Sequence, residues 1–205
     1  MRIGLLTDIH EAAGNLRAAL AMLDCEHLDA IVQIGDAVDL PGPDRGTAEV
    51  VNMLTVAGVH GVWGNHDIGF CDDVSDDIRT RAGPEVMAYM ALMRPRLELG
   101  GCLFAHVDPY LHPEVSPLEF YLHGARPVTP ALAAPSFAAV PNRVMFIGHY
   151  HQWGVTSDVA PLVWDARTPL TLDPARRFLV VVGPLVSGHF GVYDTETCVL
   201  TPFRC

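Results

Sequence analysis

The segment Arg2-Ile-Gly-Leu-Leu-Thr-Asp-Ile-His10 runs from an apolar stretch directly into two polar side chains that can bind metals. A short apolar run that ends in polar residues is typical of a buried strand in a parallel sheet. Asp8 and His10 are two residues apart, so an extended chain places both side chains on the same side. The segment therefore predicts a first strand over residues 2–7 with a ligand-bearing end.

Helical and strand patterns alternate after this first strand. Leu16, Leu20 and Leu23 recur at helical spacing and predict a helix over residues 14–25. The next predicted elements are strands over 30–34 and 59–63, with a loop over 41–46 and a helix from Thr47 between them. This β-α-β-α-β order predicts an α/β fold with right-handed crossovers.

The second half of the chain is less regular. We expect a helix from Pro84 to Met93 and a lid or capping segment over the proline-rich residues 109–142. The predicted strands cover residues 103–105, 144–147, 162–164, 178–182, 191–193 and 199–200, the last four antiparallel. No repeat or clear linker divides the sequence, so residues 1–205 are predicted to form a single domain.

Polar motifs follow five of the predicted strands. Besides Asp8 and His10, they are Gly35-Asp36, Gly64-Asn65-His66-Asp67, His106 and Gly148-His149-Tyr150-His151. In an open α/β sheet, ligands gather at the carboxyl ends of the strands, so these side chains are expected to meet at one edge. Carboxylate oxygens with neutral imidazoles suit Mn²⁺, Fe or Zn²⁺. The pattern therefore indicates a metal site.

These motifs and their order resemble the calcineurin-like metallophosphoesterase superfamily, and its small bacterial phosphodiesterase-type members in particular. The resemblance covers residues 8 to 151 and rests on Asp8-x-His10, Gly35-Asp36-x-x-Asp39, Gly64-Asn65-His66-Asp67, His106 and Gly148-His149-x-His151. It implies a sandwich of two mixed β-sheets flanked by helices. It also implies two divalent metal ions, with Mn²⁺ favoured and Fe, Zn²⁺ or Ni²⁺ as alternatives.

The resemblance assigns a role to each motif residue. One metal would be held by Asp8, His10, Asp36 and His151, and the other by Asp36, Asn65, His106 and His149, with Asp36 bridging. Hydroxide activated by the metals would attack phosphorus. His66 would protonate the leaving oxygen, or only position the phosphate, and Asp67 would orient His66. Asp39 would either steady a ligand histidine or form a salt bridge on its loop.

Departures from the family pattern bear on the substrate. Protein Ser/Thr phosphatases of the superfamily carry arginines after the second motif and before Gly-Asn-His, where this chain has Leu40-Pro41 and Trp63. The sequence therefore disfavours that substrate class. The resemblance favours hydrolysis of small phosphodiesters and allows monoesters. A dinucleoside polyphosphate hydrolase and a non-catalytic metal-binding scaffold are the alternatives.

The composition limits the partners. The 205 residues include 13 arginines and no lysine, and the formal net charge is −11. No basic stripe is visible, which disfavours extended nucleic-acid binding. Five cysteines without paired spacing, no signal peptide and no long apolar run predict a cytoplasmic protein without a membrane partner. The expected partner is a small phosphate ester.

Overall fold

The computed structural model describes residues 1–39, 46–111 and 125–205, and these form two β-sheets. Within these ranges, the first sheet has the order β3 (His60–Val62), β2 (Ala30–Ile34), β1 (Arg2–Leu6), β10 (His189–Asp194), β11 (Val199–Arg204) and β8 (Leu170–Thr171). The second has the order β4 (Arg96–Leu99), β5 (Cys102–Ala105), β6 (Val144–Ile147), β9 (Phe178–Val181) and β7 (Gly154–Ser157). Both mix parallel and antiparallel pairs, so the predicted fold class is confirmed.

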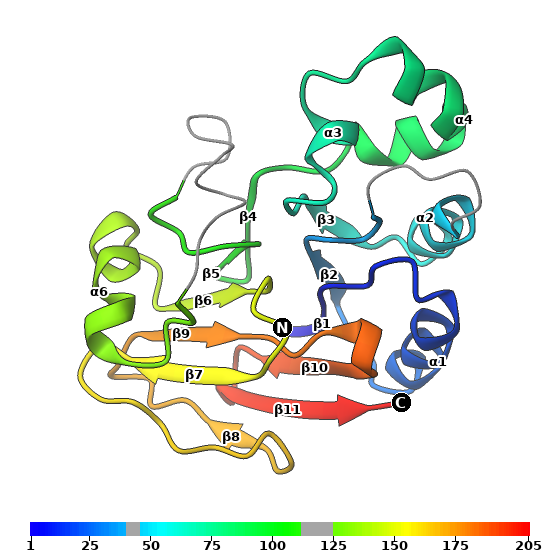
Figure 1. Cartoon of the computed structure of the whole chain (residues 1–205). Helices are drawn as coiled ribbons and strands as arrows, with labels where there is room; N and C mark the ends of the chain where they lie inside the picture. The colour runs from blue at the N-terminus through cyan, green and yellow to red at the C-terminus, as the bar shows by residue number, and fades with distance from the viewer. Residues whose placement is uncertain (40–45, 112–124) are drawn as a thin grey trace.

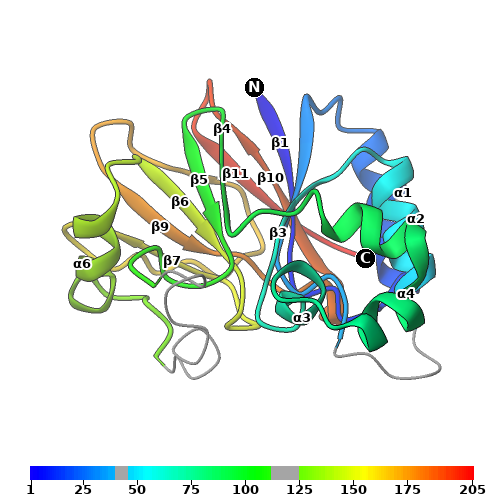
Figure 2. The same ribbon diagram turned by 90° about the horizontal axis from the view of Figure 1, so that it is seen from above.

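Helices cover the outer faces of this sandwich (Figures 1 and 2). The first sheet is covered by α1 (Ala13–Asp24), α2 (Thr47–Val56) and α4 (Asp76–Met90), and the second by α6 (Pro130–Ala139). A short helix, α3 (Ile68–Cys71), and a 3₁₀ turn, η1 (Leu185–Ser187), complete the described elements. The crossovers through α1 and α2 make β1, β2 and β3 parallel, as predicted.

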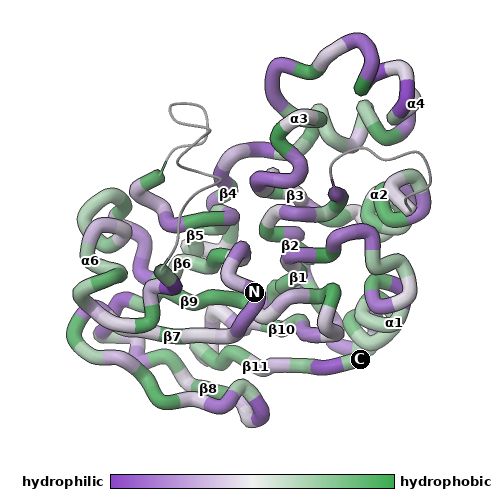
Figure 3. Tube along the Cα trace, viewed as in Figure 1, coloured by the Kyte–Doolittle hydropathy of each residue, from purple (hydrophilic) through white to green (hydrophobic). Residues whose placement is uncertain are grey.

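The core between the sheets follows from alternation along the strands. Ile3 and Leu5 of β1 point between the sheets, whereas Leu6 packs under the helices. From the second sheet, Phe104 and Phe146 stack with their ring centroids 5.4 Å apart. Strands β5, β6 and β9 are hydrophobic along their length (Figure 3), because apolar side chains cover both of their faces.

Two of the sequence-based element predictions need correction. The helix expected over Pro84–Met93 is the second part of α4, which begins at Asp76 and is broken at Gly83, where φ is 81°. The strand expected over 162–164 is wrong. Leu162 and Trp164 pack against the core between the sheets and Val163 is fully exposed, which is the alternation of a strand. The segment nevertheless forms only an isolated bridge, from Pro161 to Thr156, because Pro161 has no N–H for a longer ladder. The strand expected to be antiparallel over 178–182 is β9, which is antiparallel to β7 but parallel to β6.

Two further predictions fall partly on residues outside the described ranges. Most of the loop expected over 41–46 lies there, and so does 112–124 of the expected lid. The described end of that segment forms α6, whose Ala133 packs on the outer face of the second sheet. Among the described residues, no helix is both long and apolar enough to cross a membrane.

Candidate metal centre

The five predicted polar motifs meet at one edge of the sandwich. Each follows the carboxyl end of a strand, namely β1, β2, β3, β5 or β6, and these strands belong to both sheets. The structure therefore brings together all seven side chains that the resemblance named as ligands: Asp8, His10, Asp36, Asn65, His106, His149 and His151. The site lies where the two sheets adjoin, so neither sheet could form it alone.

The backbone is unusual at most of these positions. Five of the seven have a positive φ: Asp8 (49°), His10 (45°), Asp36 (55°), His149 (68°) and His151 (50°). L-residues rarely adopt this conformation, and such strain is concentrated at functional sites. The glycines beside them give room, since a Cβ on Gly35 would overlap the His106 ring and one on Gly148 would overlap Thr7.

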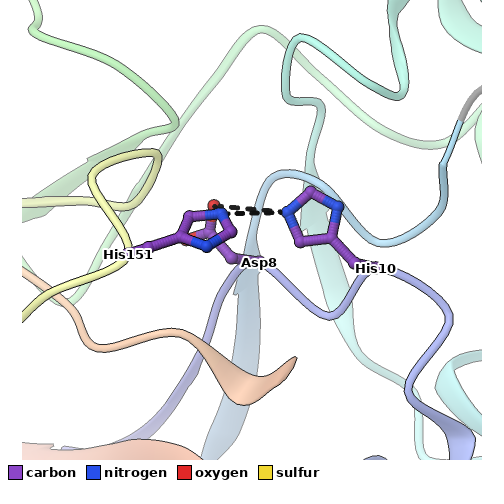
Figure 4. Close-up of side chains that lie close together, drawn as sticks. All are labelled: Asp8, His10 and His151. Carbon is purple, nitrogen blue, oxygen red and sulfur yellow. Dashed lines mark hydrogen bonds and ion pairs between the residues drawn. The ribbon is translucent and has the colours of Figure 1, made fainter. Parts of the chain in front are cut away.

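One side of the centre is open and consists of Asp8, His10 and His151 (Figure 4). The Nε2 atoms of His10 and His151 are 3.0 Å apart, and Oδ1 of Asp8 lies 3.2 Å from Nε2 of His151. The His151 side chain is 46% exposed, whereas that of Asp8 is fully buried. His10 and His151 come from loops after β1 and β6, so this side depends on contact between the two sheets.

The other, buried side consists of Asp36, Asn65 and His106, which are buried, and the half-buried His149. Nε2 of His106 lies 3.0 Å from Asn65 Oδ1 and 3.2 Å from Asp36 Oδ2. Nδ1 of His149 lies 2.9 Å from the same Asn65 oxygen. Asp36 Oδ2 is also 3.7 Å from Nε2 of His10, so this carboxylate lies between the two sides.

The donor set fits a cation because lone pairs face each other. Nδ1 of His106 is 2.8 Å from the carbonyl oxygen of Ile34, which can only accept, so the proton of a neutral ring is there. The Nε2 lone pair then faces oxygens of Asn65 and Asp36. Such a cluster is unfavourable unless a proton or a metal ion lies within it. The residues present therefore fit divalent metals.

The pKa values of the side chains in the metal-free cluster also show that the cluster favours positive charge. Burial opposes protonation of His106, but the charge and hydrogen bond of Asp36, with the charge of Asp8 and the Ile34 carbonyl, together raise the pKa of His106 to about 9. For Asp36, burial acts to raise the pKa, yet the charge and hydrogen bond of His106, with the backbone N–H and charge of His66, together hold it well below its usual range. A hydrogen bond to Asp8 raises the pKa of His151. Both sides of the centre thus attract positive charge.

Asp39 and His66 stand at the mouth of the site. One oxygen of Asp39 lies 2.8 Å from Nδ1 of His10 and 3.2 Å from Nδ1 of His66. The rings of His10 and His66 meet edge to face with centroids 4.8 Å apart. Because the carboxylate occupies Nδ1 of His10, it leaves Nε2 as the nitrogen that can bind a metal.

Asp67 is not placed as we expected. In the described part of the chain its carboxylate accepts hydrogen bonds from the backbone N–H groups of Ala37, Val38 and Gly64 and forms no hydrogen bond or ion pair with His66. The turn that exposes His66 directs the next side chain inward, so the orienting contact comes from Asp39 instead. Burial, with the charge of Asp36, raises the pKa of Asp67 to about 7.

Two contributors were missed by the sequence analysis. The Thr7 hydroxyl donates to Asp8 Oδ2 at 2.8 Å, and the backbone N–H of His149 donates to the same carboxylate at 3.1 Å. A buried Asp108 accepts a hydrogen bond from the Tyr150 hydroxyl, between the two histidines of the last motif. Thr7 and Asp108 each adjoin a motif, but that position alone does not distinguish them from other polar loop residues.

Residues 1–166 match the calcineurin-like phosphoesterase superfamily domain, so the chain belongs to this family of metal-dependent phosphoric ester hydrolases and is a phosphoesterase. A search of curated proteins gave no match.

Solved structures share the fold. A metallophosphoesterase from Sphaerobacter thermophilus superposes with a TM-score of 0.75 at 22% identity, over 100% of this chain and 87% of that one. An archaeal phosphodiesterase gives 0.56 at 16% identity over 100% of both chains. A protein proposed to be a diadenosine tetraphosphatase gives 0.58 at 18% identity, over 98% of this chain and 93% of that one. At these identities the likeness establishes the fold alone.

Proposed function

We propose that the chain is a dinuclear metal-dependent phosphoesterase that hydrolyses small phosphodiesters, and monoesters to a lesser extent. The observation that carries this proposal is the pair of facing donor clusters that share Asp36: its Oδ2 lies 3.2 Å from Nε2 of His106 and 3.7 Å from Nε2 of His10. A bridging carboxylate suits two cations about 3.5–4 Å apart. Mn²⁺ is the proposed metal because it suits carboxylate and amide oxygens, with Fe, Zn²⁺ or Ni²⁺ as the alternatives that the imidazoles favour.

The ligands would be divided between two metal ions according to the two clusters that they form. Asp8, His10 and His151 would hold one ion, Asn65, His106 and His149 the other, and Asp36 both. When bound, the ions would supply an acidified water as nucleophile and offset charge on the phosphoryl oxygens. The protein fixes these ligands before any substrate arrives, because backbone groups hold Asp8 and Asp36 in place.

His66 is proposed to handle the proton of the leaving group. Its ring lies at the mouth beside His10, and its backbone N–H donates to Asp36 Oδ1 at 2.9 Å. With Asp39 at Nδ1, the Nε2 nitrogen of His66 is left to face a substrate oxygen. An imidazole suits proton transfer near neutral pH. Asp67 contributes by fixing the turn that carries His66.

The test combines metal analysis with hydrolysis of bis(p-nitrophenyl) phosphate and p-nitrophenyl phosphate in added Mn²⁺. We expect two ions per chain and faster turnover of the diester. The Asp36→Asn variant should lose at least one ion and nearly all activity. Asp29→Asn is a matched control, because Asp29 accepts the backbone N–H of Arg2 far from the site. An Asp36→Asn protein with two ions and full activity would contradict the dinuclear proposal.

A second candidate is hydrolysis of dinucleoside polyphosphates, which the similarity to the proposed diadenosine tetraphosphatase brings forward. Turnover of diadenosine tetraphosphate at a much higher kcat/KM than that of simple diesters would favour it. Two bound ions without hydrolysis of any ester would instead favour the metal-binding scaffold.

A further inference from the structure

His151 belongs to two parts of the structure. On one side its ring faces His10, and on the other it lines a cavity of about 660 Å³. The cavity walls come from the loop after β6, the segment between β7 and β8, strand β11, and Pro184 and His189 before and at the start of β10. Figure 1 shows β8 beside β11, which brings that segment next to the last strand. The volume lies within the range of small-molecule sites, about 300–1,000 Å³.

One wall of this cavity is aromatic. Trp153 and Trp164 are both half-buried and meet edge to face, with ring centroids 5.4 Å apart and planes at 79°. The Trp164 indole N–H donates to the Thr168 carbonyl at 2.8 Å, and Arg126 donates to the Trp153 carbonyl at 2.6 Å. The first bond holds the Trp164 ring and the second the Trp153 backbone, and both rings also pack on the core between the sheets, so the wall is preorganised to pack against a planar group.

The same cavity carries positive charge. Arg167 and Arg204 line it and are exposed, and neither guanidinium has a hydrogen-bond or carboxylate partner within the described ranges. The one acidic residue in the lining, Asp165, accepts the backbone N–H of Arg167 at 3.0 Å. Burial, together with the charge of Arg204, lowers the pKa of His189, which keeps that side chain neutral beside the arginine. Two cations are thus available for an anionic ligand.

Arg167 and Arg204 could replace phosphate-binding arginines that the sequence motifs lack. The motif positions that carry arginines in protein phosphatases of this superfamily are Leu40-Pro41 and Trp63 here, so the motifs supply no guanidinium. Arg167 and Arg204 lie in a cavity that shares His151 with the candidate centre. A guanidinium binds phosphate through paired N–H donors, and an aromatic wall next to it suits a ring on the same molecule.

We propose that this cavity binds the part of the substrate that is not hydrolysed, with an aromatic ring against Trp153 and Trp164 and a second anionic group on Arg167 and Arg204. The substrate would then be a phosphate ester of a nucleotide, which carries both groups on one molecule. This inference rests on the proposed phosphoesterase function, since the cavity adjoins the site through His151.

Inhibition by ADP tests the proposal, with bis(p-nitrophenyl) phosphate as the reporter substrate. In the Arg167→Gln/Arg204→Gln double variant we expect the inhibition constant of ADP to rise at least about tenfold, while kcat/KM for the reporter changes less than about twofold. Arg176→Gln is the matched control, because this exposed arginine lies outside the cavity lining. Trp164→Ala should weaken the binding of ADP more than the binding of pyrophosphate. Trp164→Phe should restore most of the affinity for ADP.

A second measurement separates this proposal from the function of the site. The fluorescence of the tryptophans is followed while ADP is added to the metal-free protein, where Trp164→Ala should reduce the quenching that Arg176→Gln retains in full. Active enzyme whose variants all keep the wild-type inhibition constant and quenching would overturn the cavity proposal and leave the phosphoesterase intact. A wild type that hydrolyses no ester but shows variant-sensitive quenching would support the cavity and contradict the proposed function.

Discussion

The two sides of the candidate centre are built in different ways. On the buried side, His106 is fully enclosed, and one backbone carbonyl and two oxygen ligands determine its ring position. On the open side, the His151 side chain is 46% exposed and its ring contacts come from Asp8 and His10. A buried ligand set is rigid but costly without its cation, whereas an open set can exchange contacts with substrate. We therefore expect the buried ion to be the tighter one.

Replacing one histidine on each side should give the largest effect and tests directly whether the buried ion is bound more tightly. His106→Asn should lower metal content and reduce kcat/KM by more than about 100-fold, the upper cost of losing an outer-shell partner, because it removes a ligand nitrogen from a closed site. His151→Asn should leave the buried ion bound and weaken the second one. Metal analysis after dialysis against a weak chelator checks both. Equal loss of both ions from the two variants would contradict the difference between the sides.

The proposed proton-donor role of His66, at the mouth of the open side, can be tested by substitution. His66→Ala should slow hydrolysis of esters with poor leaving groups by about 10²–10⁴-fold, because the leaving oxygen then lacks a proton donor. Esters of p-nitrophenol should be affected far less, since that anion leaves unaided. The measurement is a plot of log kcat against the pKa of the leaving group. His60→Ala is the control, an exposed histidine at the start of β3; equal slopes in all three proteins would remove the proton-donor role.

Substitution of Asp39 should have a smaller effect, because it loosens both His10 and His66. Asp39→Asn weakens the contacts to Nδ1 of His10 and His66, and outer partners of metal-binding histidines typically contribute about 10–100-fold in metal affinity or activity. We expect a loss in this range at the open ion, measured by competition with a fluorescent chelator. Asp24→Asn, on the exposed end of α1, should match the wild type. Unchanged affinity in Asp39→Asn would show that the carboxylate is dispensable.

The smallest predicted effect is a pH dependence of the buried side. In the metal-free protein the pKa of His106 is raised from 6.5 to about 9. Its protonated form therefore contributes stability fully below pH 6.5, and this is lost as pH rises through about 9. The Tm of the metal-free protein should fall over that window, while metal affinity gains about tenfold per pH unit for each proton released. A flat Tm profile for the wild type, equal to that of His106→Asn, would refute this.

Much of the fold was predictable because the pattern is local. The run at Arg2–Leu6 and the leucine spacing of α1 specify a strand and a helix through their own side chains. The segment 162–164 shows the limit, since it alternates like a strand, with Leu162 and Trp164 on the core and Val163 in solvent, yet forms no strand. Whether such a run joins a sheet depends on the neighbouring strand, and Pro161 makes only an isolated bridge because it lacks the N–H that a longer ladder needs.

The sequence alone determined the chemistry of the centre: which carboxylates, imidazoles and amide exist, and that each follows a strand end where ligands gather. Only the tertiary structure decided how they are shared between partners. Asp39 rather than Asp67 faces His66, because the turn after β3 directs one side chain outward and the next inward. The cavity beside His151 also belongs to the tertiary structure, since Trp164 and Arg204 meet there only through the pairing of β8 with β11. Contacts of such long sequence separation carry no local signal.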